Sequence, residues 1–301
     1  MLEGMEGKVA IVTGAGRGLG RAEALELARQ GVRVVVNDFG TSLTGEKEDN
    51  PAAAVVEEIK AAGGDAVAHL GDVADWDDAK AMIQLAVDTW GSLDILVNNA
   101  GLLRDRMIFN MSEEDFDLVV RVHLKGHFAT MRHACVYWRE RSKAAGGPVY
   151  GRIVNTTSEA ALLASAGQPN YAPAKAAIIA LTVSTAQAMA RAGVTANAIA
   201  PRARTRMTET VGSFDVKEGE FDVFAPENVS PLVAYLASPA AAKVSGQVFI
   251  VWGKQITVVQ GPGIDRVFDA SDAWTPDSVA KTLTPFYDER TPVTQGYLIR
   301  M

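Results

Sequence analysis

The sequence predicts an α/β fold in which a mostly parallel sheet carries helices on both faces. Short apolar runs alternate with amphipathic stretches along most of the 301 residues, and this alternation is typical of βαβ units. The strand-like runs are continuously apolar, as expected of parallel strands that are buried on both faces. A glycine-rich turn joins the first strand to the first helix, between Val12 and Leu19.

Glycine and proline residues place the boundaries of these elements in order. Seven strands are predicted at residues 9–12, 32–37, 65–69, 93–97, 152–155, 194–200 and 247–251. Helices are predicted at residues 19–30, 51–63, 75–90, 112–142, 171–191 and 226–236. Gly31 and Gly193 each follow a helix, where a left-handed residue closes the last turn. Pro51 fits a first helical turn, because that turn needs no N–H from it.

Residues 1–260 are expected to form one domain, and two stretches depart from its regular alternation. Residues 202–225 are charged but contain Phe214, Phe221 and Phe224. They form either a lid-like cover over an apolar ligand or a surface loop that these phenylalanines pack. Residues 261–301 contain several aromatic side chains, so we expect this extension to pack on the domain or on a partner subunit.

The composition excludes several classes of partner. Lys and Arg total 29 against 36 Asp and Glu, which gives a formal net charge of −7 and argues against nucleic acid or an anionic membrane surface. No run approaches the roughly 18 apolar residues of a membrane span, and the first residues lack a signal-like apolar stretch. A single cysteine, Cys135, permits no internal disulfide. We therefore expect a cytoplasmic protein without a metal site.

The turn after the first strand has the composition of a pyrophosphate cradle. It reads Gly14-x-x-x-Gly18-x-Gly20, with an additional Gly16. Glycines allow the backbone to approach a phosphate closely, and the N-terminus of the following helix favours negative charge. Because the turn stands between a predicted strand and a predicted helix, it indicates a dinucleotide site. The cofactor contacts assigned to this turn are Gly14, Arg17, Gly18, Leu19 and Gly20.

An acidic residue follows the second strand. Asp38 stands 18 residues after Gly20, near the ~20 expected of the partner of the ribose hydroxyls. A 2′-phosphate at ~5 Å from this carboxylate would be disfavoured by roughly 3 kcal/mol per unit charge, at an effective dielectric constant of ~20. Arg17 works in the opposite direction, since it could attract such a phosphate. The sequence favours NAD over NADP.

Two further turns follow predicted strands. Asn98, Ala100 and Gly101 come after the fourth strand, and Asp72 and Val73 come after the third. In an open α/β sheet, ligands bind at the carboxyl ends of the strands. We assign Asn98, Ala100 and Gly101 to cofactor binding: Asn98 suits a turn and a buried polar role, and Gly101 permits a close approach to the ribose. Asp72 and Val73 are assigned to the adenine edge.

A serine, a tyrosine and a lysine form the candidate catalytic group. Tyr171 and Lys175 share one helix face at i and i+4, and Ser158 ends the fifth strand. A phenol has a pKa near 10, but an ammonium at ~4 Å stabilises the phenolate by about 4 kcal/mol, or roughly three pKa units. That would bring the pKa of Tyr171 near 7, where general acid–base catalysis works best. Exposed helices also carry Tyr/Lys pairs, so the pair alone does not indicate catalysis. It does so here because the nucleotide-binding motifs precede it in the sequence.

The sequence resembles the short-chain dehydrogenase/reductase family over about residues 6–255, through motifs that stand in family order: Thr13-Gly14-x-x-x-Gly18-x-Gly20, Asn98-Asn99-Ala100-Gly101, Ser158 and Tyr171-x-x-x-Lys175. The resemblance implies a doubly wound, Rossmann-type catalytic domain that interconverts alcohols and carbonyls with NAD(P). It implies that Tyr171 is the acid/base, that Lys175 lowers its pKa and binds the nicotinamide ribose, and that Ser158 positions the substrate oxygen. Such proteins are usually homodimers or homotetramers.

Two positions depart from the family pattern. His123 stands where the family usually has an asparagine that supports a proton relay; the histidine either holds the relay water, or alters the relay, or is a plain core residue. Pro201 follows the sixth strand as in the family, but the threonine expected five residues later is replaced by Arg206. We assign the nicotinamide amide contact to Thr205 and include Pro201 among the cofactor-binding residues.

These departures resemble a narrower group, the (3R)-hydroxyacyl-CoA dehydrogenase domains of the peroxisomal multifunctional β-oxidation enzymes. The shared segments are Val36-Asn37-Asp38-x-Gly40, Arg121-Val122-His123-Leu124-x-Gly126 and Arg206-Met207-Thr208. The resemblance makes His123 a subfamily feature. The hydratase and carrier domains of those enzymes have no room in 301 residues.

The sequence therefore predicts an NAD-dependent oxidoreductase that interconverts a secondary alcohol and a ketone, with a 3-hydroxyacyl-CoA or steroid-type substrate. A ketoreductase acting on acyl-carrier thioesters or free steroids, and a non-catalytic NAD sensor, are the alternatives. Five arginines are predicted on loops at the carboxyl ends of strands, where they either meet the phosphates of coenzyme A or are solvated surface residues: Arg104, Arg106, Arg202, Arg204 and Arg206.

Overall fold

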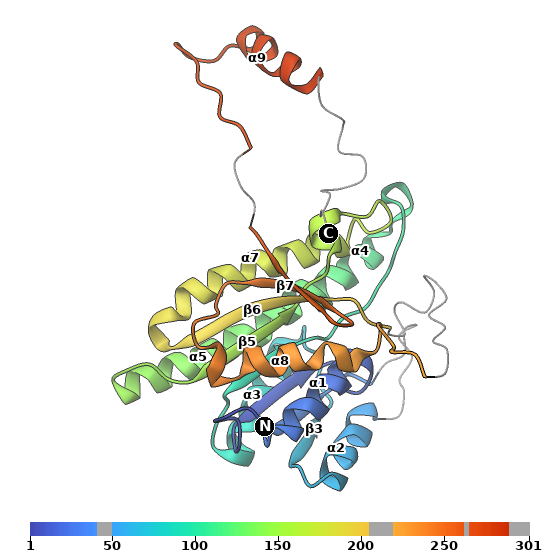
Figure 1. The fold of residues 1–301 in the computed structure, drawn as a ribbon, viewed down its shortest axis with the longest axis vertical. Coiled ribbons are helices and arrows are strands. Elements are labelled where there is room, and N and C mark those ends of the chain that lie inside the picture. Colours follow the sequence, from blue (N-terminus) through green and yellow to red (C-terminus); the bar gives the residue numbers. More distant parts are fainter. Residues whose placement is uncertain (41–49, 205–218, 262–264, 289–301) are drawn as a thin grey trace.

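The computed structural model describes residues 1–40, 50–204, 219–261 and 265–288. These ranges contain one sheet with the strand order β3-β2-β1-β4-β5-β6-β7-β8, and helices cover both of its faces (Figure 1). The strands are β1 (Val9–Thr13), β2 (Arg33–Asn37), β3 (Ala66–His69), β4 (Ile95–Asn98), β5 (Gly151–Thr156), β6 (Val194–Pro201), β7 (Val248–Trp252) and β8 (Gln255–Val259). The helices are α1 (Gly18–Arg29), α2 (Pro51–Ala61), α3 (Trp76–Trp90), α4 (Glu113–Val120), α5 (Gly126–Ala145), α6 (Ala160–Leu163), α7 (Tyr171–Met189), α8 (Ser230–Ala237) and α9 (Pro276–Asp288).

Two apolar clusters hold the layers together, because successive side chains of a strand point to opposite faces. Val34 and Val36 of β2 belong to the cluster that includes residues of α1, α2 and α8. Val35, between them, belongs to the cluster with α3, α5 and α7. The predicted α/β class with a doubly wound sheet is confirmed.

The topology gathers the candidate motifs at one edge of the sheet. All pairs from β3 through β7 are parallel, so the carboxyl ends of β1, β4 and β5 share that edge. The strand order reverses between β1 and β4, which is where open α/β sheets bind ligands. The glycine-rich turn follows β1 there, Asn99 follows β4, and Ser158 follows β5.

The last strand differs from the prediction of seven strands. β8 pairs antiparallel with β7, and Trp252 lies opposite Gln255. Two residues, Gly253 and Lys254, make the connection, and Gly253 has a φ of +51°. A glycine in this conformation suits a tight hairpin. Ile256 and Val258 of β8 are 57% and 62% exposed, as expected of an edge strand.

The long helix predicted at residues 112–142 contains a local change of pitch. α4 continues into a π-helical turn, η2 (Arg121–Lys125), which leads directly into α5. Single π-turns inside α-helices frequently occur at functional sites. The turn carries His123, which is buried.

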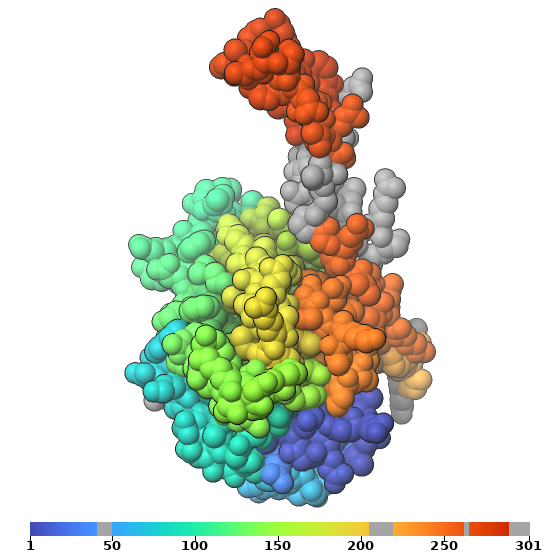
Figure 2. Space-filling view, turned by 90° about the vertical axis from the view of Figure 1, so that its left-hand side faces the viewer, coloured from blue at the N-terminus to red at the C-terminus, as the bar shows by residue number. Residues whose placement is uncertain are grey.

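The described part of the C-terminal extension stands apart from the α/β body, as both views show (Figures 1 and 2). α9 has no buried residue. Packing of this extension on a partner subunit stays a prediction. In the lid-like segment, Phe224 packs against Trp252 with ring centroids 5.8 Å apart, whereas Phe214 lies outside the described residues. Among the described helices, none combines the length and apolarity needed to cross a membrane.

Candidate active site

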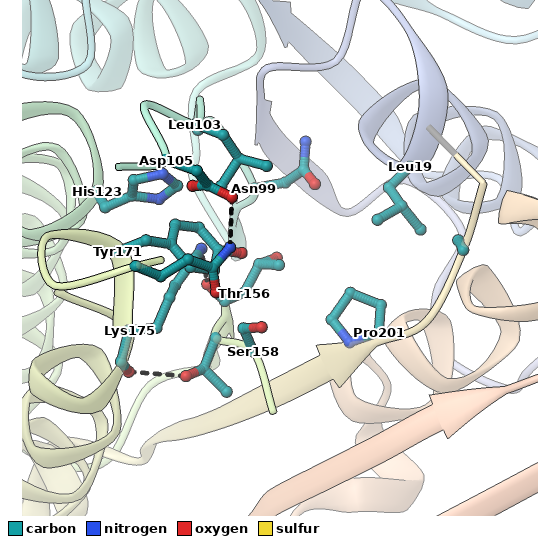
Figure 3. A pocket seen from close by; sticks show the side chains of 14 residues that line it. Leu19, Asn99, Leu103, Asp105, His123, Thr156, Ser158, Tyr171, Lys175 and Pro201 are labelled. Atoms are coloured by element: carbon teal, nitrogen blue, oxygen red, sulfur yellow. Dashed lines mark hydrogen bonds between the residues drawn. The ribbon is translucent and has the colours of Figure 1, made fainter. Parts of the chain in front are cut away.

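The glycine-rich turn is packed so tightly that side chains cannot replace its hydrogens. A Cβ on Gly14 would lie 2.8 Å from Ala100 Cα, and one on Gly20 would lie 2.3 Å from Gly14 O. Gly18 begins α1, and the N-cap residue Arg17 makes no side-chain capping hydrogen bond. The first N–H groups of α1 therefore stay available to an anion. This cradle fits the pyrophosphate of a dinucleotide, and Leu19 projects from it toward the pocket (Figure 3).

Asp38 joins the end of β2 to the cradle. One carboxylate oxygen accepts the N–H of Gly16 at 3.0 Å, and the other accepts the N–H of Gly40 at 2.9 Å. An ionised carboxylate has about four acceptor sites, so the carboxylate keeps lone pairs for ribose hydroxyls. The geometry fits the role predicted for Asp38.

The two asparagines after β4 have different surroundings. Asn98 is 1% exposed, and its side chain bonds to Asn155 at 2.9 Å and to Thr130 at 2.7 Å. Only its backbone is free to meet a cofactor. Asn99, which the sequence analysis did not assign, donates to the carbonyls of Thr13 and Gly14 at 3.1 Å and lines the pocket. β4 ends at Asn98, so the side chain of Asn98 points into the core and Asn99, the next residue, faces the pocket.

Asp72 and Val73 are held by contacts within the protein. Arg121 donates to one oxygen of Asp72 at 2.6 Å, and Ala74 N donates to the other at 2.8 Å. Val73 is 7% exposed. It packs so closely against Gly126 that a Cβ on this glycine would lie 2.8 Å from the valine side chain. Their contact with adenine stays a prediction.

A pocket of about 200 Å³ opens between the cradle and α7. Ser158, Tyr171, Lys175 and His123 lie on one side of it, and Leu19 and Pro201 lie on the other (Figure 3). Gly101 and Asn99 also line it. Apart from Asn99, these residues were all predicted to serve one site, and the fold brings them together from distant parts of the sequence.

Local contacts orient Tyr171 and Lys175 on the first turns of α7. The side chain of Asn170 caps the helix by accepting the N–H of Tyr171 at 2.7 Å. Lys175 is 2% exposed, and its ammonium donates to Thr156 O at 2.7 Å. Lys175 Nζ lies 5.5 Å from the centroid of the Tyr171 ring. The two side chains share one helix face, as the i, i+4 spacing predicts.

The ionisation of this pair differs from the sequence-based expectation. Burial raises the pKa of Tyr171 to about 12, and the hydroxyl of Ser158 partly opposes the rise. Burial also lowers the pKa of Lys175 to about 7. Lys175 is not among the causes that act on the pKa of Tyr171 in this structure, so the lowering of that pKa by the ammonium stays a prediction. Burial disfavours both charged forms, and the ammonium is directed at Thr156 O.

His123 lies at the centre of the site. Its ring packs edge-on against Tyr171 with centroids 5.1 Å apart, and Nε2 lies 2.7 Å from Leu102 O and 3.1 Å from Leu102 N. Burial, followed by the charge of Lys175, lowers the pKa of His123 well below its usual value. The ring is thus neutral. A Cβ on Gly101 would lie 2.2 Å from it, so Gly101 makes room for this histidine.

The arginines predicted near the site have acidic partners. Arg104 and Arg106 lie 3.7 and 4.0 Å from the carboxylate of Asp115. Arg202 donates to Glu159 at 2.6 Å, and Arg204 forms an ion pair with Asp222. Each of the four described arginines thus has an acidic neighbour, and their contact with the phosphates of coenzyme A stays a prediction. Thr205 and Arg206 lie outside the described residues.

Asp105 is a site residue that sequence reasoning missed. It lines the pocket, accepts a hydrogen bond from Gln168 Nε2 at 2.9 Å, and its charge contributes to the raised pKa of Tyr171. Asp105 and Gln168 come from two different loops, and both line the pocket. Short polar loop residues occur throughout the sequence, so no local signal marked them.

Comparisons with known proteins agree with this geometry. A family model described as short chain dehydrogenase matches residues 8–215. The hydroxyacyl-CoA dehydrogenase ChsB1 of Mycobacterium tuberculosis is 51% identical over 296 residues, which cover 96% of this chain and 91% of that protein. The peroxisomal multifunctional enzyme type 2 of Drosophila melanogaster is 39% identical over 86% of this chain and 41% of its own length.

A solved structure supports the same assignment. The crystal structure of a short chain dehydrogenase from Mycobacterium avium has a TM-score of 0.85 and 50% sequence identity, and covers 98% of this chain and 99% of its own. The resemblance seen in the sequence is confirmed. The chain belongs to the short-chain dehydrogenase/reductase family, whose members are NAD(P)-dependent oxidoreductases.

Proposed function

We propose that this protein is an NAD-dependent dehydrogenase that oxidises the hydroxyl group of a 3-hydroxyacyl-CoA, including thioesters with a steroid-type acyl group. One observation carries the proposal: Ser158, Tyr171 and Lys175 line a single pocket beside the glycine cradle. The printed name of the M. tuberculosis relative, a hydroxyacyl-CoA dehydrogenase at 51% identity, supports this substrate class.

The cofactor would be held by groups at the carboxyl edge of the sheet. Gly14, Arg17, Gly18, Leu19 and Gly20 would meet the pyrophosphate, and Asp38 would accept from the adenosine ribose. The remaining contacts are assigned to Asp72, Val73, Asn98, Asn99, Ala100, Gly101, Tyr171, Lys175, Pro201 and Thr205. When bound, the oxidised cofactor supplies the hydride acceptor and one positive charge.

The chain's own side chains handle the proton. Ser158 donates a hydrogen bond to the substrate oxygen and holds it near the phenol. Tyr171, as the phenolate, takes the hydroxyl proton while the carbinol carbon loses its hydride. Lys175 stabilises that phenolate as an ammonium, and every pKa unit by which it does so corresponds to about 1.4 kcal/mol. His123 acts from behind the phenol as a neutral ring that fixes its position.

The quaternary structure and location follow from the same proposal. A homodimer or homotetramer is the arrangement expected of the family. The exposed apolar residues of α9, among them Val279 and Tyr287, are consistent with a partner subunit that receives the C-terminal extension. A cytoplasmic location agrees with the acidic composition.

Initial rates, followed by the absorbance of reduced nicotinamide, test the function. The substrates are 3-hydroxyacyl-CoA thioesters of several chain lengths, hydroxysteroids and simple secondary alcohols, each with NAD and NADP. We expect the highest kcat/KM for a hydroxyacyl-CoA with NAD. A higher rate in reduction of 3-oxoacyl-carrier thioesters or free ketosteroids would identify a ketoreductase instead. Binding of NAD without turnover of any substrate would identify a sensor.

A further inference from the structure

A two-bond ion pair links two residues that stand next to the pocket. Arg202 donates through Nε and Nη2 to the two carboxylate oxygens of Glu159, and the bond from Nη2 measures 2.6 Å. Glu159 follows Ser158 in the chain, and Arg202 follows Pro201. Ser158 and Pro201 both line the pocket (Figure 3). The pair therefore ties together the chain segments that carry these two pocket residues.

Ser158 lies between two connections to β6 and the residue that follows it. Thr157, the residue after β5, donates its N–H to Ile199 O of β6 at 2.7 Å. Beyond this point the chain leaves the sheet and soon begins α6. The bond between Glu159 and Arg202 is the second connection. A serine that is held on both sides of its backbone keeps a fixed position relative to the end of β6.

The pair has the properties of a contact that fixes geometry. The side chain of Glu159 is 15% exposed and that of Arg202 is 26% exposed, so water screens the two charges less than at an open surface. A planar guanidinium meets a carboxylate through two parallel bonds only in a defined orientation. The hydrogen bond from Glu159 raises the pKa of Arg202 above its usual value. A lysine could supply the charge but not the two-bond geometry.

An aromatic ring from the edge of the sheet supports the guanidinium. The guanidinium carbon of Arg202 lies 4.9 Å from the centroid of the Trp252 ring, within the range of a cation–π contact. Trp252 packs against Phe224 with ring centroids 5.8 Å apart, and its Nε1 donates to Gln255 Oε1 at 3.0 Å. The hairpin of β7 and β8 therefore gives Arg202 a second support.

Glu159 is connected to the serine hydroxyl by a short stretch of hydrogen-bonded backbone. Ser158 Oγ accepts the N–H of Ala160 at 3.2 Å, and Ser158 O accepts the N–H of Ala161 at 3.0 Å. Glu159 lies between these donors and the serine in the chain. A shift of Glu159 would therefore disturb the hydrogen bonds that orient Ser158.

We propose that Glu159 and Arg202 are positioning residues that act through Ser158: their ion pair holds the serine hydroxyl at the distance from the cofactor side of the pocket that hydride transfer needs. The role of Ser158 in this inference rests on the proposed function, whereas the connection between the pair and the serine does not. Displacement of a reacting group by about 1 Å can cost about 10²-fold in rate. Arg202 is then part of the wall of the active site and does not bind the phosphates of coenzyme A.

Two substitutions break the pair without removing much volume. Glu159→Gln leaves one oxygen acceptor, and Arg202→Lys keeps the charge but loses the two-bond geometry. Glu58→Gln and Arg21→Lys are the matched controls, because Arg21 contacts Glu58 through the same atoms, Nε at 3.0 Å and Nη2 at 2.5 Å. That pair joins α1 to α2, and neither residue lines the pocket.

Alcohol oxidation is measured with a 3-hydroxyacyl-CoA and with the same acyl group on N-acetylcysteamine, a thioester without the phosphates of coenzyme A. We expect Glu159→Gln and Arg202→Lys to lower kcat by about 10- to 100-fold for both thioesters. KM and the dissociation constant for NAD should change by less than about twofold. The isotope effect of deuterium at the carbinol carbon on kcat should rise, because hydride transfer becomes slower. The two control variants should keep wild-type rates.

The double variant tests whether the two residues act as one contact. Glu159→Gln combined with Arg202→Lys should lose no more activity than the more impaired single variant, because the same contact is broken in each. Losses that multiply would mean that the residues act separately and would overturn the proposal. Wild-type kcat with only a lower melting temperature would make the pair a stabilising contact. A rise in KM confined to the coenzyme A thioester, at wild-type kcat, would make Arg202 a phosphate contact instead.

Hydrogen exchange separates this inference from the proposed function. The exchange of backbone amides in residues 157–163 is followed by mass spectrometry in each soluble variant. Faster exchange in Glu159→Gln and Arg202→Lys, but not in Glu58→Gln, is expected even of a protein without dehydrogenase activity. Unchanged exchange would show that the pair does not hold the serine, whatever the reaction. Faster exchange in a protein that oxidises none of the alcohols would support the connection and count against the proposed function alone.

Discussion

The carboxylate of Asp38 and the backbone of Gly16 are joined by a hydrogen bond of 3.0 Å. This bond connects the end of β2 to the glycine-rich turn after β1. The side chain of Asp38 therefore holds the turn in place and also brings a negative charge next to it. A Cβ on Gly16 would lie 2.8 Å from the same carboxylate, which makes the contact dependent on glycine. The relationship allows the charge of Asp38 to be removed while its hydrogen bond to Gly16 is kept.

Asp38→Asn should relax the preference for NAD. The amide oxygen can still accept the N–H of Gly16, while the bond from Gly40 N is lost because an NH2 group cannot accept it. The repulsion toward a 2′-phosphate, roughly 3 kcal/mol per charge at most, is removed. We expect the ratio of kcat/KM for NAD to that for NADP to fall by about 10- to 100-fold. Asp65→Asn serves as control, because Asp65 is an exposed acid just before the start of β3, whereas Asp38 follows the end of β2. A wild-type enzyme that prefers NADP would contradict our interpretation of Asp38.

Tyr171→Phe should abolish most turnover while leaving the cofactor site intact. Proton transfer by a positioned side chain contributes typically 10²–10⁴-fold, so kcat should fall by about this factor. NAD should still raise the melting temperature of the variant. Tyr287→Phe makes the same change on α9, where the tyrosine is 62% exposed, and should keep wild-type rates. Equal activity of both variants would rule out the phenol as the base.

Glu23 makes the protein less stable as the pH rises. It is fully buried in α1 and has no hydrogen-bond partner among the residues that the structure describes, and burial raises its pKa from 4.5 to about 8. In the unfolded chain the carboxyl ionises above about 4.5, whereas in the folded chain it stays protonated until about 8. The stability associated with this group is complete below the unfolded pKa and is lost as the pH rises through the folded pKa.

Glu23→Gln should remove this pH dependence. The shift of about 3.5 units (8 − 4.5) corresponds to roughly 5 kcal/mol at high pH, as an upper bound. Urea unfolding at pH 5, 6.5 and 8 should show that the variant gains free energy of unfolding relative to wild type as the pH rises. A difference between the two proteins that stays constant from pH 5 to 8 would show that Glu23 does not titrate in this way.

Gly101→Ala should disturb His123. The new Cβ would lie 2.2 Å from the His123 ring, and the ring has little room to move because it packs against Tyr171. Overpacking of this kind costs about 1–3 kcal/mol, and kcat should fall with the displaced ring. Gly147→Ala is the matched control, because a Cβ there meets nothing within 4 Å. Similar unfolding curves for the two variants would mean that the backbone yields at Gly101.

The parallel strands and the glycine-rich turn could be predicted because each leaves a strong local pattern. β1 is buried at all five positions, and a strand buried on both faces is continuously apolar. β8 leaves a weaker pattern, since Ile256 and Val258 are exposed on a two-sided edge strand. The signal that could have revealed it is Gly253-Lys254 between two apolar runs, a two-residue hairpin turn.

Ser158, Tyr171, Lys175 and the glycine-rich turn were predictable members of the site, whereas Asp105 and the electrostatics of the site were not. Tyr171 and Lys175 share a face because of helical spacing, which any sequence shows. The sequence does not show that the ammonium bonds to Thr156 O, nor that Asn98 faces the core while Asn99 faces the pocket. These facts depend on how several elements pack together. Spacing along the helix determines which way a side chain points, whereas tertiary contacts determine how well it is solvated and whether it is charged.

The π-turn Arg121–Lys125 fixes the rotational phase between the two halves of a long helix. Each residue advances an α-helix by about 100°, and this turn holds one residue more than an α-helical turn. Upstream, Asp115 O on α4 accepts a hydrogen bond from Asn170 at 3.2 Å; downstream, Met131 and Trp138 of α5 fill the core. Because the wide turn absorbs the additional residue, the two faces stay in phase across it; a one-residue deletion inside α5 itself would instead rotate one part of that core face by about 100° relative to the other.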